Sequence, residues 1–212
     1  MQNRTQVPPP RRQRRKEARP SEIVAAAFEV FAERGFGAAK LEEVARRAGV
    51  AKGTVFVYFP TKQDLFRAVA QNVLSSHLER VAGAASESDR PLPELVPLLL
   101  AQAAKAGESR VPAVLRLIIA EARAFPDLAQ IWHDEVVGKV LGLLTQAIKR
   151  AQARGEVRPG DPKLYAFSIM GPMLAGVIFR EVFHATTTAL PDLPKLAAQH
   201  ARTVLQGLLA PL

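Results

Sequence analysis

The residues with the most distinctive chemistry in this sequence lie close together: Lys52, Gly53, Thr54, Tyr58 and Lys62. The first three open a short predicted helix over 52–59, and the other two lie near its end and just beyond it. Backbone N–H groups at a helix start bind phosphate oxygens well, and a glycine there lets another backbone come close. A tyrosine hydroxyl or a lysine ammonium also binds phosphate. The cluster therefore predicts contact with a nucleic-acid backbone; the structural alternatives are packing for Gly53 and the Tyr58 ring, and a solvated side chain for Lys62.

Residues 41–66 predict the elements that hold this cluster. Apolar side chains recur on one helical face at Leu41, Val44, Ala45 and Ala48. Gly49 follows where a left-handed residue ends a helix, and Pro60 ends the second helix because the residue before a proline is pushed out of helical geometry. Thr61 caps a third helix, with Asp64 at the acidic position of a capping box. A helix, a glycine-containing turn and a second helix form a helix-turn-helix unit, whose second helix can enter the major groove of DNA.

A preceding amphipathic helix is predicted from Pro20, which suits a first helical turn, to Arg34. Gly35 stops this helix, and Phe36 points inward from the turn that follows. The apolar face consists of Ile23, Val24, Ala27, Phe28, Val30 and Phe31. The simplest role for this helix is to brace the two that follow.

Residues 1–19 form a basic segment that we predict to be a disordered arm. Of the formal net charge of +9, residues 1–20 contribute +6, from seven Lys and Arg against the single acid Glu17. One interpretation is an arm that contacts phosphates or the minor groove. The alternative is a solvated tail that partly extends the first helix. The segment has no apolar stretch after its charges, so it is not a secretory signal.

The composition excludes several classes of site. The 212 residues include no cysteine, which excludes disulfides and thiolate metal sites and allows a reducing cytoplasm. The four histidines are far apart and form no HExxH pair, and no phosphate-cradling GxxxxGKS/T stretch occurs. No apolar run reaches the ~18 residues that a membrane span needs. We therefore expect no enzyme, no metal, no cofactor and no membrane partner.

Residues 67–212 are predicted to be helical throughout, because no useful length alternates with period two. The stretches LVPLLLAQAA and LRLIIAEA are apolar on more than one helical face, so neighbours must cover them on most sides. Gly155 and Asp161 mark a helix end and the next helix start, and Gly171-Pro172 should kink the helix that follows. The chain is thus expected to be all-α, with a small domain over 20–66 and a larger one over 67–212.

Residues 20–66 resemble the DNA-binding domain of the TetR family of transcriptional regulators. The shared motifs are Gly35-Phe36, Val44-Ala45, Ala48-Gly49-Val50, Lys52-Gly53-Thr54, Tyr58-Phe59 and Lys62-x-x-Leu65. The resemblance implies an N-terminal three-helix helix-turn-helix domain followed by a larger C-terminal helical domain that binds an effector and dimerises. It also implies a cytoplasmic homodimer that binds a double-stranded DNA operator, more often as a repressor.

Four positions depart from the family's usual residues in ways that bear on DNA contact. One is Ala51, which stands where a Ser or Thr just before Lys52 is usual. Lys40 stands where a capping Ser or Thr is usual, and it can instead reach a phosphate directly. Within the second helix, Phe56 and Val57 stand where polar groups are common. These two side chains favour apolar contact, for instance with thymine methyl groups.

The resemblance further implies a ligand pocket in the C-terminal domain, where an apolar bundle hosts a mostly apolar effector of unknown identity. The candidate lining residues are Leu99, Arg116, Ile119, Trp132, His133, Phe167, Met170 and Met173. The alternative for each apolar one is plain core, and for the Trp132–Glu135 cluster a helix whose tryptophan packs while its neighbours stay solvated. Surplus apolar surface on the last two helices predicts a four-helix interface with a second copy. Its candidate residues are Ile178, Phe179, Val182, Phe183, Val204, Leu205, Leu208 and Leu209.

Two function hypotheses result. In the first, the protein is a ligand-responsive repressor that releases its operator when the effector binds the C-terminal domain. In the second, it is an architectural or nonspecific nucleic-acid-binding protein, in which the basic arm does most of the binding. A strong preference for promoter-derived over random DNA at rising salt favours the first.

Overall fold

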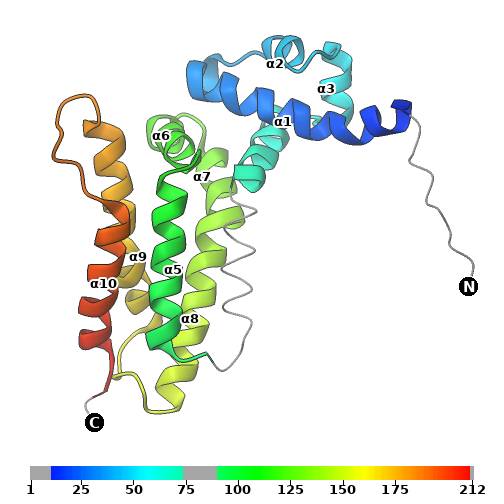
Figure 1. Ribbon diagram of the computed structural model, residues 1–212. Coiled ribbons are helices and arrows are strands. Elements are labelled where there is room, and N and C mark those ends of the chain that lie inside the picture. Colours follow the sequence, from blue (N-terminus) through cyan, green and yellow to red (C-terminus); the bar gives the residue numbers. More distant parts are fainter. Residues whose placement is uncertain (1–10, 74–89, 211–212) are drawn as a thin grey trace, which may run out of the picture. The chain divides into compact units, whose positions relative to one another are not determined.

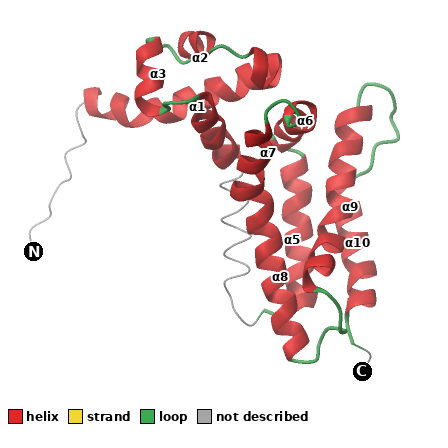
Figure 2. Ribbon diagram, turned by 180° about the vertical axis from the view of Figure 1, so that it is seen from behind, coloured by secondary structure: helices red, strands yellow, loops and turns green. Residues whose placement is uncertain are grey.

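A computed structural model describes residues 11–73 and 90–210 (Figures 1 and 2). In these two ranges all regular structure is helical, apart from one isolated antiparallel β-bridge between Val157 and Leu209. The all-α prediction is therefore confirmed. The chain divides into two compact units, Met1–Val69 and Ala70–Leu212, and the predicted domain boundary after residue 66 lies close to that division.

The first unit contains α1 (Arg11–Ala38), α2 (Leu41–Arg47) and α3 (Lys52–Tyr58), and a further helix begins at residue 62 and is described as far as residue 73. Within α1 the helical geometry breaks at Gly35, whose φ of 76° and ψ of 168° favour glycine. The predicted stop at Gly35 is confirmed, and a short helical turn follows it.

Helix α1 begins well before the predicted start. It includes residues 11–19, so the prediction of a disordered arm over 1–19 is wrong for that part, and Pro20 lies inside the helix instead of in its first turn. The physical reason is that Arg, Gln, Lys, Glu and Ala all have high helix propensity, so a basic segment without apolar residues can still extend a helix. Residues 1–10 of the predicted arm lie outside the described part of the chain.

Three phenylalanines form the centre of the first unit. The ring centroids of Phe31 and Phe36 lie 5.5 Å apart, those of Phe36 and Phe66 lie 5.9 Å apart, and those of Phe31 and Phe66 lie 6.1 Å apart. All three side chains are buried. Because these rings come from α1, from the turn after Gly35 and from the helix over 62–73, their tilted and edge-on contacts join the start and the end of the unit.

The turn between α2 and α3 has the geometry of a Schellman motif. Gly49 has φ +64°, its N–H donates to Arg46 O at 3.2 Å, and the N–H of Val50 donates to Ala45 O at 3.0 Å. At the other end of α3, the Thr61 and Asp64 side chains cap each other's backbone N–H groups at 3.1 and 3.0 Å. Both predicted signals, the left-handed Gly49 and the capping box, are confirmed.

Arg47 joins α2 to α1. Its guanidinium donates to both carboxylate oxygens of Glu33 at 2.7 and 2.5 Å, and it also donates to Glu43 at 2.8 Å. These bonds lower the pKa of Glu33 and raise that of Arg47, because each partner favours the charged form of the other. The role of Arg47 in this structure is thus to hold two helices together.

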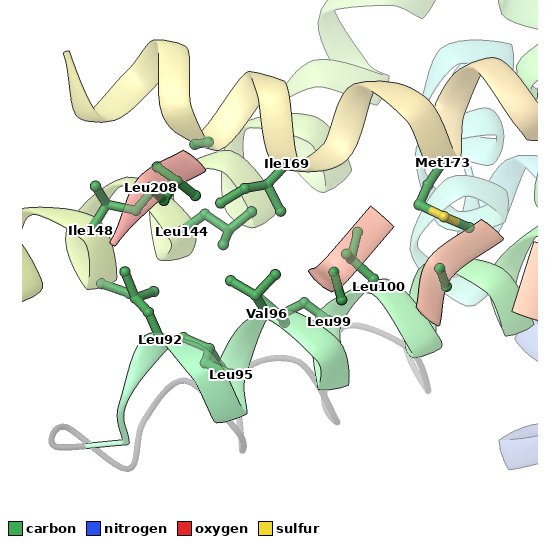
Figure 3. Packing of buried hydrophobic residues seen from close by; sticks show 14 of the residues in the cluster. Leu92, Leu95, Val96, Leu99, Leu100, Leu144, Ile148, Ile169, Met173 and Leu208 are labelled. Atoms are coloured by element: carbon green, nitrogen blue, oxygen red, sulfur yellow. The ribbon is translucent and has the colours of Figure 1, made fainter. Parts of the chain in front are cut away.

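The second unit contains α5 (Leu92–Gly107), α6 (Val111–Glu121), α7 (Pro126–Trp132), the π-helical segment η1 (His133–Val137), α8 (Gly138–Ala153), α9 (Pro162–Phe183) and α10 (Leu193–Leu208). Helices α5, α8, α9 and α10 run side by side (Figures 1 and 2), and α9 packs against α5, α6, α8 and α10. Figure 3 shows how the core residues of α5, among them Val96 and Leu100, face Leu144 of α8 and Ile169 of α9.

Local signals in this unit largely match the sequence. Gly155, with φ +75°, follows the end of α8, and the Asp161 carboxylate accepts from the N–H of Lys163 at 2.8 Å at the start of α9. Both predictions are confirmed. Helix α9 continues through Gly171-Pro172 with helical backbone angles, so no interruption occurs there.

By length and composition alone, α9 is the one helix in the described ranges that could cross a membrane. The expectation that no stretch is apolar enough was therefore too strong, because it considered only uninterrupted apolar runs. A single helix of this kind is weak evidence for a membrane span, since a core helix of a helical bundle has the same composition. Here α9 packs against four other helices of its own unit.

The close approach of α5, α9 and α10 makes Gly107 a sensitive position. A Cβ added there would lie 2.5 Å from Leu193 Cδ1 and 2.6 Å from Val177 Cγ2. We predict that Gly107→Ala lowers the free energy of unfolding by roughly 1–3 kcal/mol, because such overpacking forces side chains to move. Urea unfolding would measure this change.

The matched control is Gly142→Ala in α8, where an added Cβ meets nothing within 4 Å. This change should raise the free energy of unfolding by up to about 1 kcal/mol through helix propensity. Equal stabilities for the two variants would contradict the close approach of the three helices.

Candidate functional site

Helix α3 presents an exposed apolar surface. Only Val55 is fully buried, whereas Phe56 is 42% exposed and Val57 is 78% exposed. The alternation arises because one face of this seven-residue helix packs on its neighbours and the other faces outward. Exposed large apolar side chains on a short helix of a helix-turn-helix unit have the position that contacts base edges.

At the start of α3, the space around Gly53 is unoccupied, and the Lys52 ammonium is held in an ion pair. A Cβ added at Gly53 would meet nothing within 4 Å, so packing within the described chain does not require a glycine there. The Lys52 ammonium pairs with the Glu42 carboxylate and lies 5.7 Å from the centroid of the Phe56 ring. Thr54 is half-buried, and its N–H donates to Ala51 O at 2.9 Å. The pair with Lys52 lowers the pKa of Glu42.

The other predicted phosphate ligands differ in their surroundings. Lys40 is exposed at the N-cap of α2 and makes no side-chain cap bond, while Tyr58 is half-buried at the end of α3. The Lys62 ammonium donates to Gly37 O at 3.1 Å and lies 4.7 Å from the centroid of the Phe36 ring. Lys62 therefore fastens its own helix to the turn after α1, a structural role that the sequence did not suggest.

The second unit contains a cavity of about 200 Å³, partly open to solvent, between α5, α6, the α7–η1–α8 segment and α9. Its wall is formed mainly by aliphatic side chains, two methionines and two aromatic rings, those of Trp132 and Phe167. Among the described residues that line it, Gln102 of α5 is the one with a polar side chain. Its Oε1 is buried and has no hydrogen-bond partner in the described structure.

Five of the eight predicted pocket residues line this cavity: Leu99, Trp132, Phe167, Met170 and Met173. His133 does not; its side chain faces outward and lies 3.1 Å from Asp134 Oδ1. Arg116 and Ile119 line a second depression between α6 and α9, where Arg116 pairs with Glu181 at 2.7 Å and Ile119 is 62% exposed. His133, Arg116 and Ile119 therefore lie outside this cavity, because side chains that are close in sequence point to different sides of a helix.

The structure adds two features to the cavity that sequence reasoning missed. Gln102 was missed, although a single glutamine within the apolar stretch LVPLLLAQAA is a visible signal. The other is the π-helical segment η1, whose Val136 and Val137 line the cavity next to Trp132. Single π turns inside helices are frequent at functional sites.

The predicted dimer residues divide into two groups. On α9, Phe179, Val182 and Phe183 are exposed, Ile178 is half-buried, and the Phe179 and Phe183 ring centroids lie 4.6 Å apart. On α10, Leu208 is buried in the core and Val204 and Leu205 are half-buried; Leu209, directly after α10, is also half-buried. Leu208 is thus not available to a partner, because α10 turns its most apolar face toward α5.

Further apolar residues extend the exposed face of α9, namely Leu164, Phe167 and Leu174.

In the described ranges, no group of three or more His, Asp or Glu side chains is arranged to hold a metal ion.

Both units match known families. Residues 23–69 match the family described as bacterial regulatory proteins, tetR family, and residues 94–193 match the tetracyclin repressor-like C-terminal domain. Among curated proteins, the HTH-type transcriptional regulator RutR of Escherichia coli is 29% identical over 175 residues, 75% of this chain and 74% of RutR.

Other curated relatives match mainly at the N-terminal unit. The fatty acid metabolism regulator protein of Bacillus subtilis is 35% identical over 68 residues, 31% of this chain. The alignment spans 35% of that relative and 31% of another Bacillus subtilis regulator, YvdT, so the chain matches about a third of their lengths.

Solved structures share the fold of most of this chain. The Bacillus subtilis regulator FadR, solved with stearoyl-CoA, superposes with a TM-score of 0.73 at 22% identity, covering 88% of this chain and 98% of FadR. SmeT, the repressor of a Stenotrophomonas maltophilia multidrug efflux pump, superposes with a TM-score of 0.67 at 20% identity, and the superposition covers 90% of each chain. With a helix-turn-helix unit and a C-terminal helical unit that both match, this chain belongs to the TetR family of transcriptional regulators and is not an enzyme.

Proposed function

We propose that the protein is a cytoplasmic, homodimeric repressor that releases its DNA operator when a small apolar ligand enters the cavity of the second unit. The observation that carries the ligand response is the cavity itself, because well-packed cores rarely leave voids larger than a water molecule. A preformed apolar cavity of about 200 Å³, lined by one amide side chain whose oxygen is buried, has the character of a ligand site. FadR, which has the same fold, holds stearoyl-CoA.

On the DNA side, α3 enters the major groove. Phe56 and Val57 supply apolar contacts to base edges, of which the thymine methyl is the apolar one. Lys52, Gly53 and Thr54 at the start of the helix, together with Lys40 and Tyr58, contact phosphates and set the position of α3. Lys62 acts mainly through its bond to Gly37 O, which holds the helix over 62–73 in place.

The second copy covers the exposed apolar face of α9. Phe179, Val182 and Phe183 continue the row of exposed side chains that begins at Leu164. Burying this face against its own copy gives a two-fold interface in which each protomer contributes the same residues. Two α3 helices, one from each protomer, then reach half-sites about 34–36 Å apart.

Ligand binding and operator binding are coupled through two conformations of the protein. The ligand lowers operator affinity if it binds more tightly to a conformation whose two α3 helices do not fit successive major grooves. A difference of about 3 kcal/mol between the two conformations lowers the DNA affinity by roughly 150-fold. The π turn of η1 is the element whose backbone bonds can shift, because it lines the cavity and departs from regular α-helix.

The experiment that tests the proposal is selection of DNA fragments by the purified protein, followed by release of the selected duplex with a panel of small apolar compounds. A repressor of this kind should prefer the selected duplex to random DNA at 0.2 M salt by about a thousandfold or more. Gly171→Leu is the control, because Gly171 lines the cavity and its Cβ would meet nothing within 4 Å. This variant should keep operator binding and lose the response to compounds; little preference for the selected duplex would favour the nonspecific binder instead.

Val57 gives a direct test of base contact. We predict that Val57→Thr leaves the unfolding temperature unchanged, because the side chain is 78% exposed and the two residues have the same shape. It should relax selection at one base-pair position, with a loss of about 1–3 kcal/mol for the preferred base. Binding to a set of single-position operator variants would measure this loss.

Lys52→Met is the matched variant, because it removes a proposed phosphate contact instead of a base contact. It should weaken binding to all duplexes alike and reduce the salt slope by about one. If Val57→Thr also weakened binding uniformly, without a change at any one position, Val57 would not contact a base.

The dimer interface is tested by placing charge on α9. We predict that the double variant Phe179→Glu with Val182→Glu is a folded monomer, because four carboxylates would then lie in the two-fold apolar contact. Analytical ultracentrifugation gives the mass and circular dichroism the helix content. Lys149→Glu, at an exposed position of α8, is the control and should stay dimeric. A dimeric double variant would place the interface elsewhere.

A further inference from the structure

We propose that the ligand of the cavity is an uncharged, ring-sized molecule that donates one hydrogen bond to Gln102 Oε1. The assignment deepens the proposed ligand response and rests on it for its biological role. It is argued from three properties of the cavity as the described residues form it: no charged side chain among them, one acceptor without a partner, and the cavity's size.

The first property concerns charge. Of the described residues that line the cavity, none carries a charged side chain. The nearest cation in the neighbouring depression, Arg116, is already paired with Glu181. Placing a carboxylate, phosphate or ammonium among these apolar side chains would remove its hydration without supplying a counter-charge. The part of the ligand that enters the cavity is therefore neutral.

The second property is the state of Gln102. Its Oε1 is buried and lacks a partner in the described structure. An amide oxygen that loses water without gaining a donor destabilises the fold, and an apolar side chain of similar shape would remove that cost. A glutamine at this position is explained if a ligand group supplies the donor. A hydroxyl or an N–H satisfies Oε1, whereas an ether or ester oxygen does not.

The third property is size and shape. An engineered apolar cavity of about 150 Å³ in another protein binds benzene, so about 200 Å³ fits one substituted aromatic ring or a comparable aliphatic skeleton. The rings of Trp132 and Phe167 offer aromatic faces, and the flexible side chains of Met170 and Met173 adapt to the outline of a ligand.

Ligand binding in the cavity can be followed by the fluorescence of a residue that lines it. Trp132 is the single tryptophan of the chain, lines the cavity and is 6% exposed. Its fluorescence, excited at a wavelength that phenols do not absorb, reports binding without DNA. The ligand assignment can therefore fail while operator binding stands, and operator binding can fail while the ligand still binds.

The experiment compares three probes of nearly the same size: 4-ethylphenol, 4-ethylanisole and 4-ethylbenzoate. They differ in having a neutral donor, no donor and a full negative charge. The wild-type protein should bind 4-ethylphenol at least about tenfold more tightly than 4-ethylanisole, because only the phenol satisfies Gln102. It should bind 4-ethylbenzoate more weakly than the phenol. Isothermal titration calorimetry repeats the fluorescence series.

Gln102→Met separates a ligand anchor from a structural glutamine. In the absence of ligand this variant should have a higher unfolding temperature than wild type, because the unsatisfied oxygen is gone. Its affinities for the phenol and the anisole should become equal within about threefold. Gln146→Met, at an exposed position of α8, is the control and should keep the wild-type preference.

Three binding results would overturn the proposal, and a fourth result, on stability, would do the same. The binding results are equal affinities of the wild-type protein for the phenol and the anisole, an unchanged preference in Gln102→Met, and no binding of any of the three probes at millimolar concentration. A lower unfolding temperature of Gln102→Met would show that the amide serves the fold, which also contradicts an unsatisfied acceptor.

Discussion

The DNA-contacting part of this structure depends on packing between helices that are too short to be stable alone. Helices α2 and α3 have seven residues each, and α3 buries only one side chain completely. Isolated helices of that length are unstable in water, so most of their stability comes from tertiary contacts. The Phe31, Phe36 and Phe66 rings, the Arg47 bonds to Glu33 and Glu43, and the Schellman turn at Gly49 supply those contacts. None of these contacts involves the outward side chains of α3, Phe56 and Val57, so these two residues contribute little to the stability of the fold.

The second unit is stabilised in a different way. Its long helices α5 and α9 are apolar on several faces, so each needs several neighbours, and α9 has four. The close contacts at Gly107 and Gly176 let α5, α9 and α10 approach one another and fill the core near them. Toward α6 and η1 the packing is incomplete, which leaves the cavity. The same unit thus has a dense part and an open part, and α9 belongs to both.

Local signals were predictable from the sequence, and long-range ones were not. The turn at Gly49, the Thr61–Asp64 cap and the ends marked by Gly155 and Asp161 depend on residues within five positions of one another. The extension of α1 over residues 11–19 agrees with the alternative that the basic tail partly extends the first helix. Both interpretations were open because basic residues suit a helix as well as a solvated tail.

Other features depend on partners far away in the sequence. The Lys62 bond to Gly37 spans 25 positions, and no pattern in the sequence indicates it. The sequence placed five of eight residues correctly on the cavity, but only packing decides that Arg116 and Ile119 face a separate depression and that Leu208 faces the core. The π turn and the lack of a partner for the Gln102 oxygen also depend on packing, although the glutamine itself is visible in the apolar stretch.

The pairing of Lys52 with Glu42 has a consequence for how the protein finds its target. In the free molecule the ammonium already has an anionic partner, so in the proposed phosphate contact it exchanges one anion for another. The gain from that exchange is smaller than for an unpaired lysine, and it is equally small on every stretch of duplex. In the proposed mode of binding, this weaker contact shortens the time spent at each nonspecific site and leaves more time for sampling new positions.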